Sequence, residues 1–134
     1  MTPQTSESPS ANSHSGRLYD RLYVPDHKQY VCVLQSEIKL IKGARSSVEL
    51  RLTGGTRQVV STHLSQFRTY LSETLFVQVS RSYIVNLLYI DAIQPGCIEV
   101  DGLKVPLSPK YRDGLHRRLT LVRLRREKQL TDSP

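Results

Sequence analysis

LFVQVSRSYIVNLLYI, residues Leu75–Ile90, is an apolar run of strand-forming residues interrupted at its centre by Ser80, Arg81 and Ser82. An unpaired guanidinium is very costly to bury, so the interruption does not suit the interior of a buried strand. The pattern predicts two strands broken near this point, with the polar residues held out into solvent. The question it raises is which partner Arg81 faces.

The chain before this stretch has the pattern of short strands with tight connections. RLYDRLYV and QYVCVL lie on either side of a turn signal at Pro25–Lys28 and are expected to pair as a hairpin. EIKLIKG is expected to form the next strand. VELRL and TRQVV flank Gly54 and Gly55, a favourable hairpin signal, so they are expected to pair as well.

The periodicity then changes to that of a helix. Leu64, Phe67, Tyr70 and Leu71 recur at steps of three and four residues, which predicts a short amphipathic helix of about three turns. Its expected role is structural, to pack on a sheet. The sequence offers Ser61 or Thr62 as the residue whose side chain caps the helix N-terminus.

The chain after the central stretch contains another hairpin and another helix. IQPG is a turn, and CIEVDGLKVPL is a hairpin signal in which Asp101 and Gly102 tolerate positive φ. Ser108 before Pro109 predicts a helix start, and we expect a helix over 109–115. LTLVRL, residues 119–124, either continues this helix or forms a strand.

Length and composition set the broad class. With 134 residues the chain suits one domain, expected over 17–120, and it has no apolar segment long enough to span a membrane. Residues 1–16 lack the apolar core of a secretory signal, which favours the cytoplasm, and their composition predicts a disordered tail. Residues 121–134 are expected to be a basic extension and tail.

The charge balance favours an anionic partner. The formal net charge is +7, and nucleic acid is the commonest partner of a basic domain, ahead of a membrane surface. Cys32 and Cys97 lie in unrelated contexts without metal-ligand spacing. They are interpreted as two reduced, partly buried thiols, with a redox-active pair as the alternative.

The residue patterns of catalysis are missing from the sequence. The four histidines are scattered and have no acid or cysteine beside them at metal-ligand spacing. The sequence also lacks a nucleophile-elbow motif, a phosphate-binding glycine loop and paired carboxylates on one element. We therefore expect no enzyme, no metal and no cofactor.

Three segments together resemble the LytTR family, the DNA-binding domains of bacterial response regulators. FVQVSRSYIVN, residues 76–86, is similar to the family run F-I-R-V-H-R-S-Y-L-V-N. The preceding segment 64–71 matches L-x-x-L-x-x-x-L, and VPLSPKY, residues 105–111, is similar to I-P-V-S-R-R-Y. The front half, EIKLIKGARSSVELRLTGG, agrees more weakly with the family pattern I-x-Y-I-E-A-x-x-x-Y-x-x-x-x-T-x-x-G.

The resemblance implies a mainly β, elongated, antiparallel multi-sheet fold with one or two short helices. It also implies that loops, and not a recognition helix, contact successive major grooves on one side of double-stranded DNA, with base-reading residues at the positions of Arg81 and Lys110. The residues implied to bind DNA are Arg45, Ser46, Ser47, Ser80, Arg81, Ser82, Ser108, Lys110 and Arg112.

Arg81 suits this role on chemical grounds as well. The guanidinium matches O6 and N7 of guanine, and the neighbouring serines suit phosphate contacts. The alternative for Arg81 is an ion pair with a surface acid.

The chain departs from the family pattern at two site positions. Ser80 stands where the family usually has His, and Pro109 stands where a basic residue is common. No receiver domain precedes the motif, so we expect a stand-alone transcriptional regulator that is controlled by abundance, a regulatory protein or homodimerisation on paired sites. The alternative function is a protein-interaction adaptor that keeps the fold without binding DNA. RNA binding is less favoured, because the tyrosines mostly lie within strand patterns.

Overall fold

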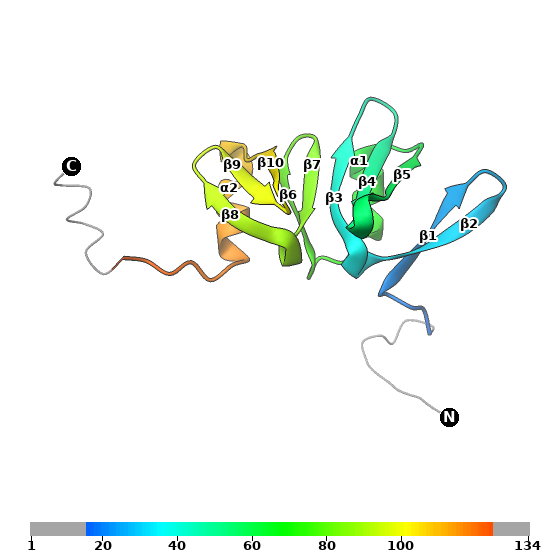
Figure 1. Cartoon of the computed structure of the whole chain (residues 1–134), viewed down its shortest axis with the longest axis horizontal. Coiled ribbons are helices and arrows are strands. Elements are labelled where there is room, and N and C mark those ends of the chain that lie inside the picture. Colours follow the sequence, from blue (N-terminus) through cyan, green and yellow to red (C-terminus); the bar gives the residue numbers. More distant parts are fainter. Residues whose placement is uncertain (1–15, 125–134) are drawn as a thin grey trace.

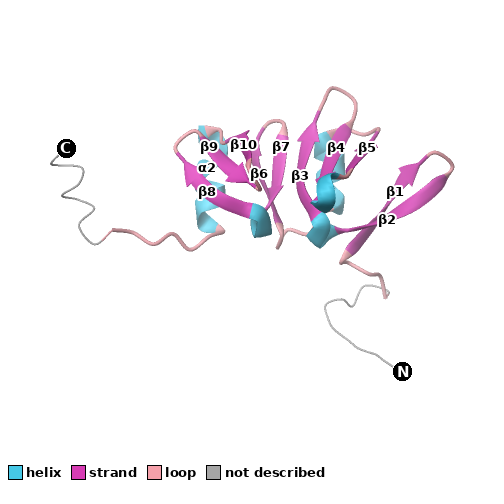
Figure 2. Cartoon of the chain, in the orientation of Figure 1, coloured by secondary structure: helices cyan, strands magenta, loops and turns pink. Residues whose placement is uncertain are grey.

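The strands assemble into three antiparallel sheets that follow one another along the long axis of the molecule (Figure 1). The computed structural model describes residues 16–124. Strands dominate the described part, and its helices are short (Figure 2). The expected mainly β, elongated multi-sheet fold is therefore confirmed.

The sheets differ in size. A two-stranded sheet pairs β1 with β2, a five-stranded sheet has the order β5-β4-β3-β7-β6, and a three-stranded sheet has the order β10-β9-β8. The strands are β1 (Arg21–Asp26), β2 (Gln29–Leu34), β3 (Ile38–Gly43), β4 (Val48–Leu52), β5 (Arg57–Val60), β6 (Phe76–Ser80), β7 (Tyr83–Asn86), β8 (Ile90–Gln94), β9 (Cys97–Val100) and β10 (Leu103–Pro106). The helices are α1 (Leu64–Phe67) and α2 (Pro109–Arg117), with 3₁₀ turns η3 (Gln35–Glu37), η4 (Thr53–Gly55), η5 (Arg68–Tyr70) and η6 (Leu87–Tyr89).

Both faces of the five-stranded sheet are covered, because successive side chains of a strand point to opposite faces. In β3, Ile41 belongs to one buried cluster and Leu40 to the other, and in β7 the same division separates Ile84 from Val85. These central strands are consequently apolar on both sides. The sheet is the layer that holds the rest of the molecule together.

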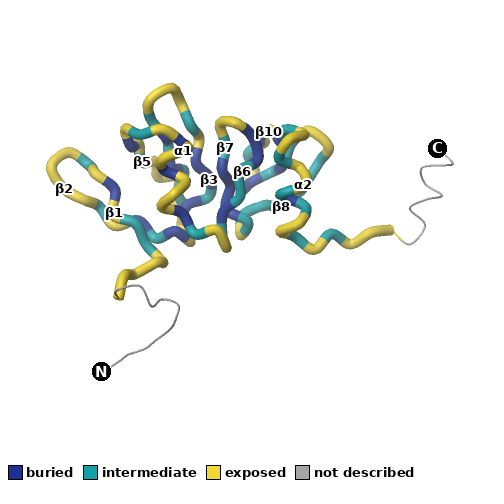
Figure 3. The backbone as a smooth tube through the Cα atoms, turned by 180° about the vertical axis from the view of Figure 1, so that it is seen from behind, coloured by how far each residue is buried: buried dark blue, intermediate teal, exposed yellow. Residues whose placement is uncertain are grey.

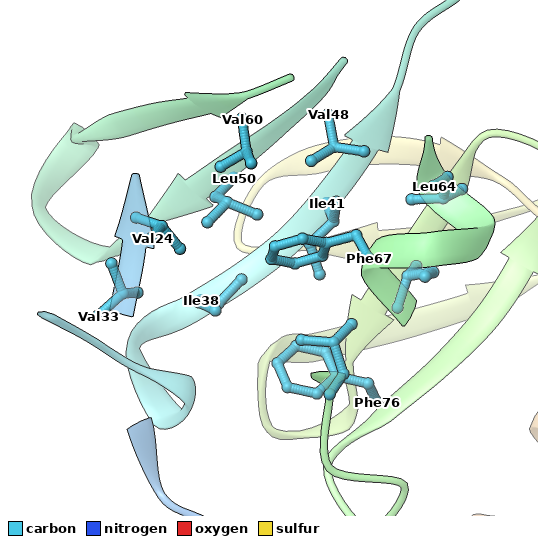
Figure 4. Close-up of a cluster of buried hydrophobic side chains, with 12 residues drawn as sticks. Val24, Val33, Ile38, Ile41, Val48, Leu50, Val60, Leu64, Phe67 and Phe76 are labelled. Carbon is cyan, nitrogen blue, oxygen red and sulfur yellow. The ribbon is translucent and has the colours of Figure 1, made fainter. Parts of the chain in front are cut away.

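The first cluster, called the hairpin-side core, lies between this sheet, α1 and the β1–β2 hairpin. Phe67 of α1 packs over β3, and the hairpin adds Val24 and Val33 (Figure 4). Its buried members are Val24, Val33, Ile38, Ile41, Val48, Leu50, Val60, Leu64, Phe67, Leu71, Phe76 and Ile84. The expected structural role of the 64–71 segment is confirmed.

The second cluster, called the α2-side core, joins the opposite face of the five-stranded sheet to the three-stranded sheet and α2. Leu115 of α2 is fully buried in it. Its buried members are Leu40, Val79, Val85, Ile98, Val100, Val105, Leu107 and Leu115. Each core buries more than half a dozen apolar side chains, each of which stabilises the fold by roughly 1.5–3 kcal/mol relative to exposure.

Two buried amides join the hairpin to the sheets. Asn86 is fully buried, and its Nδ2 donates to the carbonyls of Ile38 at 2.9 Å and Gln35 at 3.3 Å. Gln35 in turn donates to the carbonyl of Tyr19 at 3.0 Å and accepts from the N–H of Ser72 at 2.8 Å. Buried polar groups are stable only when paired, so these bonds fix the approach of the hairpin to the sheet.

The helix predicted over 64–71 is shorter than expected and begins differently. One α-turn, α1, is followed by the 3₁₀ turn η5. His63, not Ser61 or Thr62, occupies the N-cap position, and its carbonyl accepts from the N–H of Phe67 at 2.9 Å. The Thr69 hydroxyl donates to a carbonyl of α1, which competes with continued α-helix.

The C-terminal helix runs two residues further than expected and then stops. α2 ends at Arg117, and Arg118 donates through its guanidinium to the carbonyls of Thr74 at 3.0 Å, Phe76 at 3.2 Å and Glu73. This anchors the chain to the segment before β6. Residues 119–124 form neither of the two expected structures, since they belong to no helix and no strand, and Val122 is 93% exposed.

Several expectations concern other features of the chain. The tail expected over 1–16 and the extension expected over 121–134 lie largely outside the described residues. Cys32 is exposed, Cys97 is half-buried, and both thiols are free. Within residues 16–124, neither helix is long and apolar enough to cross a bilayer.

Candidate nucleic-acid interface

The interrupted stretch of the sequence forms the turn between β6 and β7. Ser80 pairs with Tyr83 across the hairpin, which leaves Arg81 and Ser82 as the two turn residues. Both are exposed at the tip. The predicted break of the apolar pattern is thus a tight turn between two strands that are buried along most of their length.

Ser80 differs from the other two residues of this turn. It is only 6% exposed, and its hydroxyl oxygen accepts from the N–H of Ser82 at 3.3 Å. We expected a solvent-facing hydroxyl for phosphate contact. The bulge in β6 between Gln78 and Ser80 turns Ser80 inward instead, where it holds the shape of the turn.

The guanidinium of Arg81 is available to a ligand. Within residues 16–124 it makes neither an ion pair nor a hydrogen bond, and it lies in solvent at the turn. The alternative expectation, an ion pair between Arg81 and a surface acid, is therefore not found in the described part of the chain. An exposed, unpaired fork of N–H donors suits a planar acceptor such as a guanine edge.

The loop between β3 and β4 lies directly beside this turn. The N–H of Gly43 donates to the carbonyl of Ser82 at 2.7 Å, and the N–H of Ala44 closes the loop on the carbonyl of Ser47 at 2.8 Å. Arg45 and Ser46 are exposed, and Ser47 is half-buried. The sequence resemblance assigned this loop to DNA, and the backbone bond places it next to Arg81.

The start of α2 lies on the other side of the same turn. The N–H of Ser108 donates to the carbonyl of Val79, two residues before Arg81, at 2.9 Å. Lys110 and Arg112 are exposed in the first turn of α2, and the Lys110 ammonium lies 5.6 Å from the ring centre of Tyr111. Ser108 occupies the expected N-cap position, although its hydroxyl makes no capping bond.

The three segments therefore lie next to one another along one edge of the described molecule, which we call the loop edge. The β3–β4 loop and the β6–β7 turn project at the same edge (upper edge in Figure 1), and their tips are exposed (yellow in Figure 3). Two backbone hydrogen bonds fix their order, with the β6–β7 turn between the β3–β4 loop and the start of α2. The bonds join residues that are 39 and 29 positions apart in the chain, by their numbers.

The acidic side chains that form ion pairs do so with basic residues outside these three segments. Glu49 pairs with Arg51 at 3.1 Å and Arg57 at 3.5 Å, and Asp101 pairs with Lys39 at 2.6 Å. At the hairpin, hydrogen bonds from Arg21 hold the pKa of Asp20 below its ordinary value. The cations at the loop edge are left without carboxylate partners in the described part of the chain, so the edge carries net positive potential.

Sequence reasoning missed one basic residue of this edge. Lys42 is exposed at the end of β3, immediately before the β3–β4 loop, and stands opposite Tyr83 in β7. The sequence signal was weak because a lysine in a strand is more often a solubilising residue. Its position is recognisable only from the pairing of β3 with β7, which sets it beside the Arg81 turn.

Within residues 16–124, the structure brings together no group of three His, Cys, Asp or Glu side chains that could hold a metal ion. The available chemistry at the loop edge is that of hydrogen-bond donors and positive charge. Such a surface binds anions and acceptor-rich edges, which are the features of a nucleic-acid groove.

Comparison with known proteins agrees with this geometry. A family model described as the LytTr DNA-binding domain matches residues 28–120. Among solved structures, the chain is similar to the LytTr DNA-binding domain of a protein described as a methyl-accepting/DNA response regulator from Bacillus cereus. The TM-score is 0.65 at 19% identity, over 76% of this chain and 98% of that one. No curated protein matches the chain.

The structural likeness concerns the fold, whereas the family match covers well over half of the 134 residues. The sheets, the exposed basic loop edge and the family match together show that the chain belongs to the LytTR family of DNA-binding domains.

Proposed function

We propose that this protein is a bacterial transcriptional regulator, acting in the cytoplasm, that binds double-stranded DNA sequence-specifically. Its three loop-edge segments would enter successive major grooves on one side of the duplex. The observation that supports this most is the contiguous arrangement of Arg45, Arg81 and Lys110 on segments joined by backbone hydrogen bonds, all exposed.

Arg81 is the central base-reading residue of the proposal. Its guanidinium donates two hydrogen bonds to O6 and N7 of a guanine, a pairing worth ~1–3 kcal/mol of discrimination. Lys110 reads a base acceptor in a neighbouring major groove, and Arg112 follows two residues later in the same turn of α2, on a different side of the helix. Arg45 reaches the groove from the opposite side of the Arg81 turn.

The serines of the site position the protein on the sugar-phosphate backbone. Ser82 and Ser46 are exposed next to basic residues, while Ser47 and Ser108 are half-buried. Hydroxyl contacts to phosphate fix register without reading bases. Ser80 belongs to the site through its hydrogen bond within the turn.

Gel shift against duplexes selected from a random pool tests the function. We expect binding that weakens steeply with salt, because each neutralised phosphate adds about 0.9 to the negative slope of log K against log salt concentration. Selection with the wild-type protein should yield a sequence motif. Absence of salt-sensitive binding would contradict the proposal.

Homodimerisation on paired sites and control by a regulatory protein extend the proposal. Exposed tyrosines on the β1–β2 hairpin, Tyr23 at 57% and Tyr30 at 72%, supply a surface for protein contacts at a distance from the loop edge. The same tyrosines favour the second candidate, a protein-interaction adaptor without DNA binding. The gel shift separates the two candidates.

A further inference from the structure

Gln78 of β6 connects the helical segment to the Arg81 turn. Its Oε1 accepts from Nη1 of Arg68 in η5 at 3.2 Å, and its Nε2 donates to the carbonyl of Ser80 at 3.0 Å. One half-buried side chain thus bridges two elements that the backbone does not join directly.

The two bonds fix the orientation of the Gln78 amide. A guanidinium is only a donor, so the amide oxygen must face Arg68. The amide nitrogen then faces the Ser80 carbonyl, which is only an acceptor. Each end of the amide is matched, and a flipped amide would lose both bonds.

The β6–β7 turn needs support of this kind because its backbone is not that of an ordinary two-residue hairpin. Such turns usually have positive φ, since their twist then matches that of the strands. The β9–β10 turn follows this rule, with Asp101 at φ 51° and Gly102 at φ 85°. Neither Arg81 nor Ser82 has positive φ, and β6 carries a bulge just before them.

Side-chain bonds from Gln78 and Ser80, together with one backbone bond, therefore hold the Arg81 turn in its shape. Gln78 holds the Ser80 carbonyl, the Ser80 hydroxyl holds the Ser82 N–H, and the Ser82 carbonyl accepts from the N–H of Gly43. The bonds form a continuous path from Arg68 through the turn to the β3–β4 loop. The path holds the backbone on both sides of Arg81, at the Ser80 carbonyl and at the Ser82 N–H and carbonyl.

We propose that Gln78 is a positioning residue for DNA sequence recognition, aligning Arg81 with its base, and that Arg68 fixes the Gln78 amide for this purpose. The inference rests on the proposed function. It assigns specificity to a residue that does not itself contact bases. A bidentate contact requires both donors to be aligned, so a loosened turn should lose discrimination before it loses phosphate contacts.

Gln78→Glu is the most informative variant. The carboxylate keeps the size of the side chain and still accepts from Arg68, but it has no N–H to donate to Ser80. Gln58→Glu is the matched control, because Gln58 is a half-buried glutamine on β5, at the opposite edge of the same sheet. Gln78→Met removes both hydrogen bonds without adding charge and serves as a second variant.

The first measurement is binding to the selected duplex and to duplexes with one base pair changed at a time. We expect Gln78→Glu and Gln78→Met to lose about tenfold or more of the discrimination at the base pair read by Arg81, and little elsewhere. In an Arg81→Ala background neither variant should lower that discrimination further. Unchanged discrimination, an equal loss at every base pair, or an additive loss with Arg81→Ala would overturn the proposal.

The second measurement needs no DNA. Hydrogen exchange at the Ser82 and Gly43 amides should speed up in both Gln78 variants and stay unchanged in Gln58→Glu, because the loss of the Ser80 bond loosens the turn. Unchanged exchange would overturn the positioning role whatever the protein binds. If exchange responds while the wild type itself fails to discriminate between duplexes, the proposed function fails and the assignment to recognition falls with it.

Discussion

The N–H of Gly43 donates to the carbonyl of Ser82 at 2.7 Å, so the β3–β4 loop and the β6–β7 turn form one continuous edge. The bond joins residues that are 39 positions apart in the chain, by their numbers. This backbone hydrogen bond fixes the two segments relative to each other, and the side chains at their tips remain exposed. A change that separates Gly43 from Ser82 should therefore disturb DNA contacts on both segments.

Gly43→Ala should destabilise the protein. A Cβ at this position would lie 3.1 Å from Cβ of Leu64, a buried residue of α1, so either β3 or α1 must move. Overpacking of this kind costs about 1–3 kcal/mol. The free energy of unfolding in urea measures it. Gly96→Ala is the control, because its Cβ would meet nothing within 4 Å, and equal stability of the two variants would contradict the packing argument.

Arg81→Ala should relax base preference more than it weakens overall binding. Loss of a bidentate contact costs ~1–3 kcal/mol at one base pair, and phosphate contacts elsewhere remain. Quantitative binding to single-base-pair variants of the selected duplex gives the difference. Arg57→Ala, on β5 at the opposite edge of the sheet, should leave the preference intact. A wild-type preference profile for Arg81→Ala would refute the assignment.

Lys42→Ala should weaken binding to all duplexes alike. Lys42 stands beside the turn and faces solvent, where it can neutralise a phosphate. The slope of log K against log salt concentration should become shallower by about 0.9, the effect of one lost phosphate contact. Lys28→Ala, at the tip of the β1–β2 hairpin, provides the comparison. If both variants keep the wild-type slope, Lys42 does not contact DNA.

Asn86→Leu should lower stability without touching the loop edge. The leucine would leave the carbonyl of Ile38 and the N–H of Leu88 without their side-chain partner, at a cost of about 1–3 kcal/mol. Urea denaturation monitors the loss, with Gln58→Leu as the reference for a half-buried polar residue. A variant as stable as the wild type would show that these bonds contribute nothing net.

Individual strands and hairpins could be predicted from the sequence wherever an apolar run met a turn signal. Asp101 and Gly102 marked the β9–β10 turn, and the observed positive φ angles are the reason such residues stand there. The break at Arg81 was equally visible, because a charged residue in a buried strand has no stable place. These signals are local, which is why the sequence carries them.

The parts that could not be predicted depend on contacts between distant segments. His63, and not Ser61 or Thr62, occupies the N-cap position of α1. At the other helix, Arg118 follows the last residue of α2 and bonds to a backbone carbonyl of the distant residue Phe76. Ser80 is buried next to a β-bulge, and no residue type in the sequence predicts a bulge at this position. Adjacency of the three loop-edge segments follows from sheet order, and only the resemblance to the family anticipated their joint role.

Guanine N7 methylation interference on the selected duplex tests most directly whether the loop edge enters the major groove. Methyl groups at N7 block the major groove, where we place Arg81 and the neighbouring segments. We expect interfering guanines grouped on one side of the duplex about one helical turn apart, ~10 base pairs, with one group lost in Arg81→Ala. Strong binding with no interference at any guanine would contradict it.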